Sequence, residues 1–434
     1  MKVHIIGGGL AGSEAALQLA ERDIEVILFE MRPARMTPVH NTEYFAELVC
    51  SNSLKSVEVT NAHGLLKEEL KTLHSYLLEI AEKHSLPGGK ALVVDRLKFS
   101  QEVTNLIESH PNIKVIREEI TSLPSEGIVL IASGPLTSDA LALEIKKLTG
   151  DEFLYFFDAL SPIVDAETLD FSKLYYRDRH GLDDSSYLNA PLTKEEYYNF
   201  VEALLNAEVH IPHLEEEKKY FEGCLPIEVM ARRGPETLRY GPLNPRGLKD
   251  PKTGKTPYAV VQMRPENKER SMFSLVGFQT QLKYPEQKRV FRMIPGLENA
   301  VFLRYGAVHR NTYIHSPGLL DIHLRLKRDP RILFAGQLIG TEGYVEAIMG
   351  GLMAALNIYN ILKMGGPLPP PPETTMIGAL LRYVTENDKK DFQPMNANLG
   401  LLPPVDFRLK GRAKREIKSK RALRDILKWK EENL

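Results

Sequence analysis

A glycine-rich segment near the amino terminus restricts the fold more than any other feature of the sequence. Its members are Gly7, Gly8, Gly9, Leu10, Ala11 and Gly12. An expected buried strand over residues 2–6 precedes it, and an expected helix with an alanine-lined face over residues 11–21 follows. Glycine at the first, third and sixth positions permits a tight turn, close approach of a pyrophosphate and close packing of helix on strand. The start of the helix also offers free N–H groups and a positive dipole end, so we expect a dinucleotide there.

An acidic residue completes this expected unit. Residues 25–30 (EVILFE) form the next expected strand, and Glu30 ends it, 18 residues after Gly12. A carboxylate at this place can accept hydrogen bonds from a ribose diol. The alternative is a simple glycine-rich turn with an exposed glutamate. The order of strand, glycines, helix, strand and carboxylate favours the dinucleotide site.

Short strands and helices alternate along the amino-terminal part of the chain. Expected strands cover residues 113–116 and 128–132, and expected helices cover 62–83, 96–109 and 139–148. This alternation predicts an α/β fold with a parallel, doubly wound sheet.

The middle of the chain has a different pattern. Short β-rich runs broken by Gly and Pro cover residues 258–314 and favour a separate sheet, whereas the strand–helix pattern returns at 331–336. A chain of 434 residues is long enough for two or three domains. We therefore expect a nucleotide-binding domain formed by residues 1–185 and 325–434, with a mixed α+β domain inserted over residues 186–324.

The segment between the late strand and the long helix after it indicates which dinucleotide is bound. It contains Gly336, Gln337, Gly343 and Glu346, and no second GxGxxG motif occurs in the chain. A second helix amino terminus aimed at the switch point suits a flavin ring, whose N1–O2 edge needs charge compensation. Gly350 and Gly351 each cost about 1 kcal/mol of helix propensity, so something must pack very close to them. A plain crossover helix is the alternative, and we favour FAD.

Composition and charge narrow the class of protein. The chain is 43% hydrophobic and 26% charged, as in a globular enzyme, and its net charge is −1. The last 34 residues nevertheless carry 11 Lys and Arg against 5 Asp and Glu. This basic tail indicates a polyanionic partner, or alternatively only a solvated helix end. We expect the apolar run at 345–362 to be a buried helix, since it contains Glu346 and Asn357.

The two cysteines form neither a disulfide framework nor a CxxC metal motif. We expect a cytoplasmic protein, because the chain enters a strand at once and leaves no room for a signal peptide. The pair His210 and His213, separated by Ile and Pro, is far more typical of a surface loop than of a metal site. By base rate a lone cysteine is a small buried hydrophobe. Cys224, however, has Arg232 and Arg233 nearby, which favour a thiolate that could attack an electron-poor carbon such as C6 of a pyrimidine.

Segments along the whole chain resemble the folate- and FAD-dependent tRNA (uracil-5-)-methyltransferase family, TrmFO. They are GGGLAG with EMRP (30–33), CSNSLKS (50–56), LPGGKALVVDR (86–96), SGPLTS (133–138), YFFDA (155–159), FEGCLPIEVMARRGPETLRYGPL (221–243), RYGAVHRNT (304–312), AGQ with EGYVE (335–346) and FQPMN (392–396). The stretch around Cys224 is long and specific.

The resemblance implies a glutathione-reductase-like FAD-binding fold with one inserted domain. It also implies methylation of C5 of the uridine at position 54 in the tRNA T loop, with 5,10-methylenetetrahydrofolate as carbon donor and NAD(P)H as reductant through FAD. Cys224 then corresponds to the nucleophile and Cys50 to an assisting residue of unsettled role. His309 corresponds to a residue that stacks on the pterin, with a structural histidine as the alternative. Arg232, Arg233 and the tail over 408–430 are candidates for phosphate contact.

Three other functions are alternatives to this one. A relative that modifies the wobble uridine carries a long helical carboxyl-terminal extension, which this chain is too short to hold. A small-molecule flavin or disulfide oxidoreductase needs a second nucleotide motif or a closely spaced cysteine pair, and the sequence has neither. A non-catalytic RNA-binding module would bind tRNA without turnover. We expect tRNA, tetrahydrofolate and NAD(P)H as partners, with no membrane and no stable protein partner.

Overall fold

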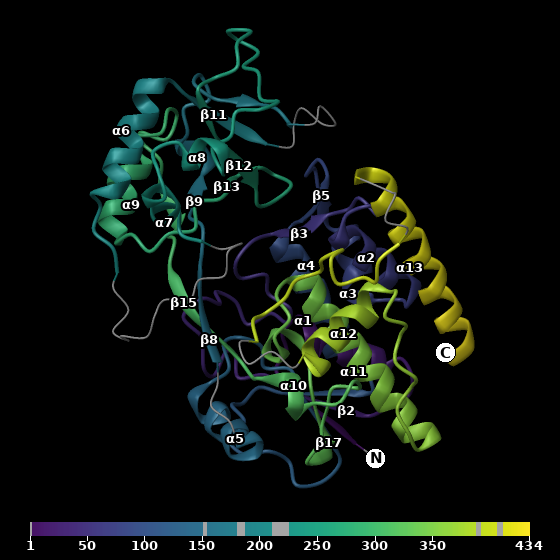
Figure 1. Cartoon of the computed structure of the whole chain (residues 1–434). Helices are drawn as coiled ribbons and strands as arrows, with labels where there is room; N and C mark the ends of the chain where they lie inside the picture. Colours follow the sequence, from purple (N-terminus) through teal and green to yellow (C-terminus); the bar gives the residue numbers. More distant parts are fainter. Residues whose placement is uncertain (1, 151–153, 180–186, 211–224, 388–391, 406–410) are drawn as a thin grey trace.

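The computed structural model describes the chain except residues 1, 151–153, 180–186, 211–224, 388–391 and 406–410. The described residues form two bodies, and the paired strands β8 (Leu154–Ala159) and β15 (Val308–Tyr313) run between them (Figure 1). Each body has its own hydrophobic core.

A mainly parallel sheet forms the centre of the first body. Its strands are β1 (Val3–Ile6), β2 (Val26–Phe29), β6 (Ile113–Ile116), β7 (Ile128–Ile131), β16 (Arg325–Leu326) and β17 (Asp329–Phe334). Their order is β16-β17-β7-β1-β2-β6, and only the pairing of β16 with β17 is antiparallel within this described sheet. The predicted doubly wound α/β fold is confirmed. A small sheet of β3 (Ser53–Ser56), β5 (Ala91–Val94) and β4 (Ser85–Leu86) lies beside it.

Helices surround this sheet. They are α1 (Leu10–Ala20), α2 (Ala62–Thr72), α3 (Tyr76–Lys83), α4 (Arg96–Ser109), α5 (Asp139–Thr149), α10 (Ser316–Leu319), α11 (Tyr344–Met364), α12 (Met376–Glu386) and α13 (Gly411–Asn433). The prediction of one helix over residues 62–83 is wrong. The chain breaks at His74, whose φ is +58°, and the Ser75 side chain caps the start of α3. The buried Glu14 carboxylate accepts the N–H groups of Tyr76 and Leu77, which makes this break part of the core.

The second body is an antiparallel sheet covered by helices. Its strands are β9 (Ile163–Asp165), β10 (Tyr175–Tyr176), β11 (Leu188–Leu192), β12 (Ala259–Pro265), β13 (Met272–Leu275) and β14 (Phe302–Arg304), in the order β10-β11-β12-β13-β9-β14. Its helices are α6 (Lys194–Leu205), α7 (Ile227–Arg232), α8 (Thr237–Tyr240) and α9 (Tyr284–Phe291). Because β9 and β10 precede residue 186 and the core of this body runs from Val164 to Phe302, we propose boundaries near residues 160 and 307 in place of the expected 186 and 324.

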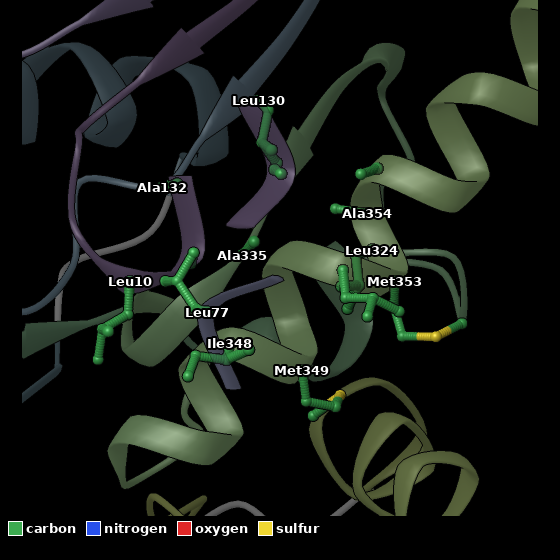
Figure 2. Close-up of a cluster of buried hydrophobic side chains, with 14 of the residues drawn as sticks. Leu10, Leu77, Leu130, Ala132, Leu324, Ala335, Ile348, Met349, Met353 and Ala354 are labelled. Carbon is green, nitrogen blue, oxygen red and sulfur yellow. The ribbon is translucent and has the colours of Figure 1, made fainter. Parts of the chain in front are cut away.

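The long helix α11 packs into the core beside α1. A Cβ added at Gly351 would lie 2.1 Å from the Ala11 carbonyl oxygen, and one at Gly350 would lie 2.9 Å from the Gly336 nitrogen. The prediction of a very close contact at these glycines is confirmed. Figure 2 shows Leu10 of α1 in the same cluster as Ile348 and Met349 of α11. Although α11 is long and apolar enough to cross a membrane, 78% of its most apolar window is buried inside the protein, as expected of a core helix.

From Gly411 to Asn433 the basic tail forms the helix α13, which lies along the outside of the first body (Figure 1), while Arg408 and Lys410 lie outside the described residues. Its inner face buries Ala422, Ile426 and Trp429, and the Trp429 indole N–H donates to the Pro369 carbonyl at 2.9 Å. Its outer face exposes basic side chains. The tail is therefore a docked helix with one charged face.

Candidate functional site

The glycine-rich turn lies at the carboxyl end of β1. Gly7 has a φ of +105°, and a Cβ there would lie 2.6 Å from the Ala132 carbonyl oxygen. A Cβ at Gly12 would lie 1.9 Å from the Gly7 carbonyl oxygen, so only glycine allows α1 to pack on this turn. A Cβ at Gly9, in contrast, would meet no described atom within 4 Å. Open space therefore lies where the motif requires a pyrophosphate to approach.

Glu30 lies in the cleft beside this turn. The cleft has about 560 Å³ of empty space and is lined by Gly7, Gly9 and Glu30. The Glu30 carboxylate accepts the Gly8 N–H at 2.9 Å and the Arg32 backbone N–H and Nε, each at 3.0 Å. Burial acts to raise the pKa of Glu30, but the charge and hydrogen bonds of Arg32 outweigh it and hold the pKa below its ordinary value. Glu30 therefore presents an ionised acceptor, although protein donors already use part of its capacity.

A second cavity, with about 1020 Å³ of empty space including its open mouth, lies at the amino end of α11. Cys50, Gln337, Gly343 and Glu346 line it. Leu136 lines both this cavity and the cleft beside Glu30, so the two spaces are neighbouring parts of one site. The fold thus brings Cys50 together with the 336–346 segment, which is distant from it in sequence.

Asn311 of β15 also lines the second cavity, and sequence reasoning assigned it no role. Its side chain is 1% exposed, and its Oδ1 has no hydrogen-bond partner among the described residues. A buried acceptor left unpaired costs about 1–3 kcal/mol. A ligand donor in the cavity would remove that cost. The only sequence signal was its place in the RYGAVHRNT segment.

Protein contacts orient the polar groups of the 336–346 segment. The Glu346 carboxylate accepts the Ala397 N–H at 2.7 Å and lies 3.3 Å from the His63 Nδ1. Burial acts to raise the pKa of Glu346, but the hydrogen bond from His63 and nearby charges lower it overall. Gln337 donates to Glu342. Gly343 has a φ of +121°, and a Cβ there would collide with Glu346, so this helix start requires glycine.

Tyr344 holds the backbone of Cys50 at the cavity wall. The Tyr344 hydroxyl accepts the N–H groups of Cys50 and Ser51 at 2.8 and 3.0 Å. Burial raises the pKa of Tyr344, which keeps this hydroxyl neutral. Cys50 is half-buried and free of a disulfide.

The other sequence-predicted residues lie elsewhere or outside the description. Cys224 lies outside the described residues. The chain is described again from Leu225, and Ile227 donates its N–H to the carbonyl of Gln279, a residue that lines the Cys50 cavity, at 2.7 Å.

Arg232 and Arg233 are exposed at the end of α7. His309 pairs with Asp158 across the β15–β8 ladder, and its side chain is outside the description. Among the described residues no group of His, Cys, Asp and Glu could hold a metal ion.

Comparisons with known proteins bear on both the fold and the family. The family model described as glucose inhibited division protein A matches residues 2–364. A methylenetetrahydrofolate--tRNA-(uracil-5-)-methyltransferase TrmFO of Dictyoglomus turgidum is 55% identical over 98% of this chain and 97% of its own length. The TrmFO of Persephonella marina is 53% identical over 98% of both chains. Among solved structures, GidA of Aquifex aeolicus aligns with a TM-score of 0.71 at 17% identity, over 99% of this chain and 73% of that one.

The space above Gly9 yields a test of dinucleotide binding. The φ of Gly9 is −73°, which alanine adopts without strain, and no described atom would meet the new methyl group. Gly9→Ala should therefore melt like the wild type as apoprotein, yet bind flavin at least about tenfold more weakly because the methyl group blocks the pyrophosphate. Flavin absorbance per protein after gel filtration measures this. Gly366→Ala, also in open space, is the matched control. Full flavin retention in Gly9→Ala would contradict the assignment.

Proposed function

The chain belongs to the TrmFO family, and we propose that it methylates C5 of the uridine at position 54 in the tRNA T loop. The carbon comes from 5,10-methylenetetrahydrofolate, and NAD(P)H supplies the electrons. The observation that carries this proposal is the cavity shared by Cys50 and the amino end of α11, in a chain whose sequence matches relatives of this name over nearly their whole length.

FAD fits the residues of this site. The open space above Gly9, the ionised Glu30 carboxylate in the cleft and the unpaired Asn311 Oδ1 in the neighbouring cavity suit a dinucleotide that spans both spaces. When bound, FAD supplies the hydride that reduces the one-carbon unit and carries that carbon to the uracil.

The helix starts provide the donors for this cofactor. Leu10 and Ala11 lie in the first turn of α1, where backbone N–H groups have no acceptor within the helix. They would hold the pyrophosphate, while the Gly8 N–H holds Glu30. The positive end of α11, with Gly336 and Gln337 beside it, would face the flavin ring.

The cysteines make the uracil reactive. C5 of uracil is a weak nucleophile, but a thiolate that adds at C6 converts the ring into an enolate whose C5 can attack the one-carbon unit. Loss of the C5 proton and elimination of the thiolate then restore the ring, and the methylene carbon is reduced to methyl. We assign the nucleophile to Cys224 and assistance to Cys50. The products are 5-methyluridine, tetrahydrofolate and NAD(P)+.

The remaining predicted residues are assigned to the binding of folate and tRNA. We assign His309 to the pterin and the exposed Arg232 and Arg233 to tRNA phosphates. The uridine must leave the stack of the T loop to reach the cavity, as in other enzymes that act on a base. We place the enzyme in the cytoplasm, acting without a stable protein partner.

Substitution of the cysteines tests the assigned chemistry. Cys224→Ala should bind FAD as the wild type does but form no 5-methyluridine, because the C6 addition is lost. Cys50→Ala should also retain FAD and show slower methylation. Nucleoside mass spectrometry of treated tRNA gives both rates. Methylation by Cys224→Ala at the wild-type rate would show that another group adds to C6.

Charge reversal on the exposed part of α13 tests whether this helix contacts tRNA. Arg415 and Lys420 are exposed residues of α13. The double variant Arg415→Glu/Lys420→Glu should bind tRNA more weakly and reduce the slope of log affinity against log salt by about one unit or more, since each phosphate contact contributes about 0.7–0.9. Lys146→Glu/Lys147→Glu on α5 changes the net charge equally and is the control. Equal slopes for the two variants would show that α13 does not contact tRNA.

A further inference from the structure

The Cys50 segment, residues 48–52, lies where the two bodies meet. Its backbone and polar side chains receive hydrogen bonds from arginines of both bodies. From the first body, Arg96 at the start of α4 donates Nη1 to the Leu48 carbonyl at 2.8 Å. The Arg96 Nη2 also lies 2.7 Å from the Glu266 carboxylate of the second body.

Arg304, the last residue of β14, joins the Cys50 segment to the second body directly. Its Nη1 donates to the Val49 carbonyl at 2.9 Å, and its Nη2 donates to the Cys50 carbonyl at 3.3 Å. The same Nη2 donates to the Ser161 carbonyl at 3.1 Å. One guanidinium thus ties the backbone of Cys50 to a residue beside β9.

A second arginine of this body supports the far end of the segment. Arg264 of β12 donates Nε to Asn52 Oδ1 at 2.6 Å and Nη2 to Ser51 Oγ at 2.8 Å. Asn52 in turn donates to the Pro265 carbonyl at 3.0 Å. The Tyr344 hydroxyl of the first body accepts the N–H groups of Cys50 and Ser51. The segment is therefore held by hydrogen bonds from both bodies.

The Arg304 side chain is half-buried at this contact. Burial, with the nearby charge of Arg96, lowers the pKa of Arg304 to about 10. The guanidinium still carries its charge at neutral pH, and its hydrogen-bond partners here are carbonyl groups, which makes these bonds charge-assisted. The planar fork reaches acceptors in several directions, and a lysine ammonium at this place could not reach all of them.

We propose that Arg304 is a positioning residue for the methylation reaction, which holds the Cys50 backbone against the second body and so keeps Cys50 at the wall of the cavity. The proposal rests on the assigned role of Cys50. Arg304 touches backbone carbonyls of the segment and acts through Cys50. Arg304 therefore contributes both to the docking of the second body and to the placement of this thiol.

Arg304→Lys tests the proposal, because it keeps the positive charge and removes the planar guanidinium group that reaches several carbonyl groups at once. The readouts are the rate of iodoacetamide modification of Cys50, followed on its own peptide by mass spectrometry, and kcat and KM for tRNA. Arg292→Lys is the matched control, since Arg292 donates Nε and Nη2 to a carbonyl of its own body, Ala300, at 3.0 and 2.8 Å. FAD content and melting temperature report folding.

We expect iodoacetamide to modify Cys50 several-fold faster in Arg304→Lys than in the wild type, because the Cys50 segment loses the hydrogen bonds of Arg304. Its kcat should fall on the order of 10- to 100-fold with little change in KM, as for a misplaced reacting group. Arg292→Lys should match the wild type in both readouts. If Arg304→Lys does not fold, Arg304→Gln, which removes the buried charge, is expected to give the same pattern.

Two results separate the proposal from the function on which it rests. Equal Cys50 modification rates in Arg304→Lys and Arg292→Lys would overturn the positioning role, whatever the activity. Faster Cys50 modification in Arg304→Lys would support it even if Cys50→Ala proves fully active, in which case the assigned role of Cys50 fails instead.

Discussion

The contact between the start of α1 and Gly351, two turns into α11, is the constraint on which the rest of the site depends. The Ala11 carbonyl of α1 approaches α11 so closely that only glycine fits at position 351, and Gly12 allows α1 the same approach to the turn after β1. This contact brings two helix amino ends to the same edge of the parallel sheet. The cleft beside Glu30 and the cavity beside Cys50 are then neighbours, each next to the positive end of a helix dipole. A dinucleotide that spans them joins the two halves of the site.

The second body completes the site. Sheet pairing within it is antiparallel, its core is separate, and it reaches the first body through β8, β15 and the arginine contacts to the Cys50 segment. Contacts of this kind set the distance between groups contributed by different bodies. The reactive cysteine chemistry proposed for this chain requires such control, because an error of about 1 Å in the position of a reacting group can cost about 100-fold in rate.

Local sequence patterns predicted the doubly wound sheet and the glycine contacts, because strand burial and helix packing leave strong periodic signals. The same patterns failed at residues 62–83, where apolar spacing continued through a break that depends on Glu14, a residue distant in sequence. The expected domain boundary at residue 186 also disagrees with the strand pairing, which joins β9 and β10 to the sheet of the second body. These strands are too short to show a sequence pattern of their own. The places of Asn311 and Arg304 could not be predicted from the sequence. They depend on the folded chain, which puts Asn311 at the cavity and Arg304 against the carbonyl groups of Val49 and Cys50. Both residues lie in the RYGAVHRNT segment (304–312), but the resemblance implied a role for neither of them.

The transfer of carbon from folate to tRNA tests the central claim most directly. The holoenzyme is incubated with unmodified tRNA, NAD(P)H and 5,10-methylenetetrahydrofolate labelled at its methylene carbon. Digestion of the tRNA and mass spectrometry then locate the label. The account predicts labelled 5-methyluridine at position 54 of the T loop, dependent on NAD(P)H. Label at the wobble position, or unmodified uridine at position 54 with tRNA bound, would contradict it.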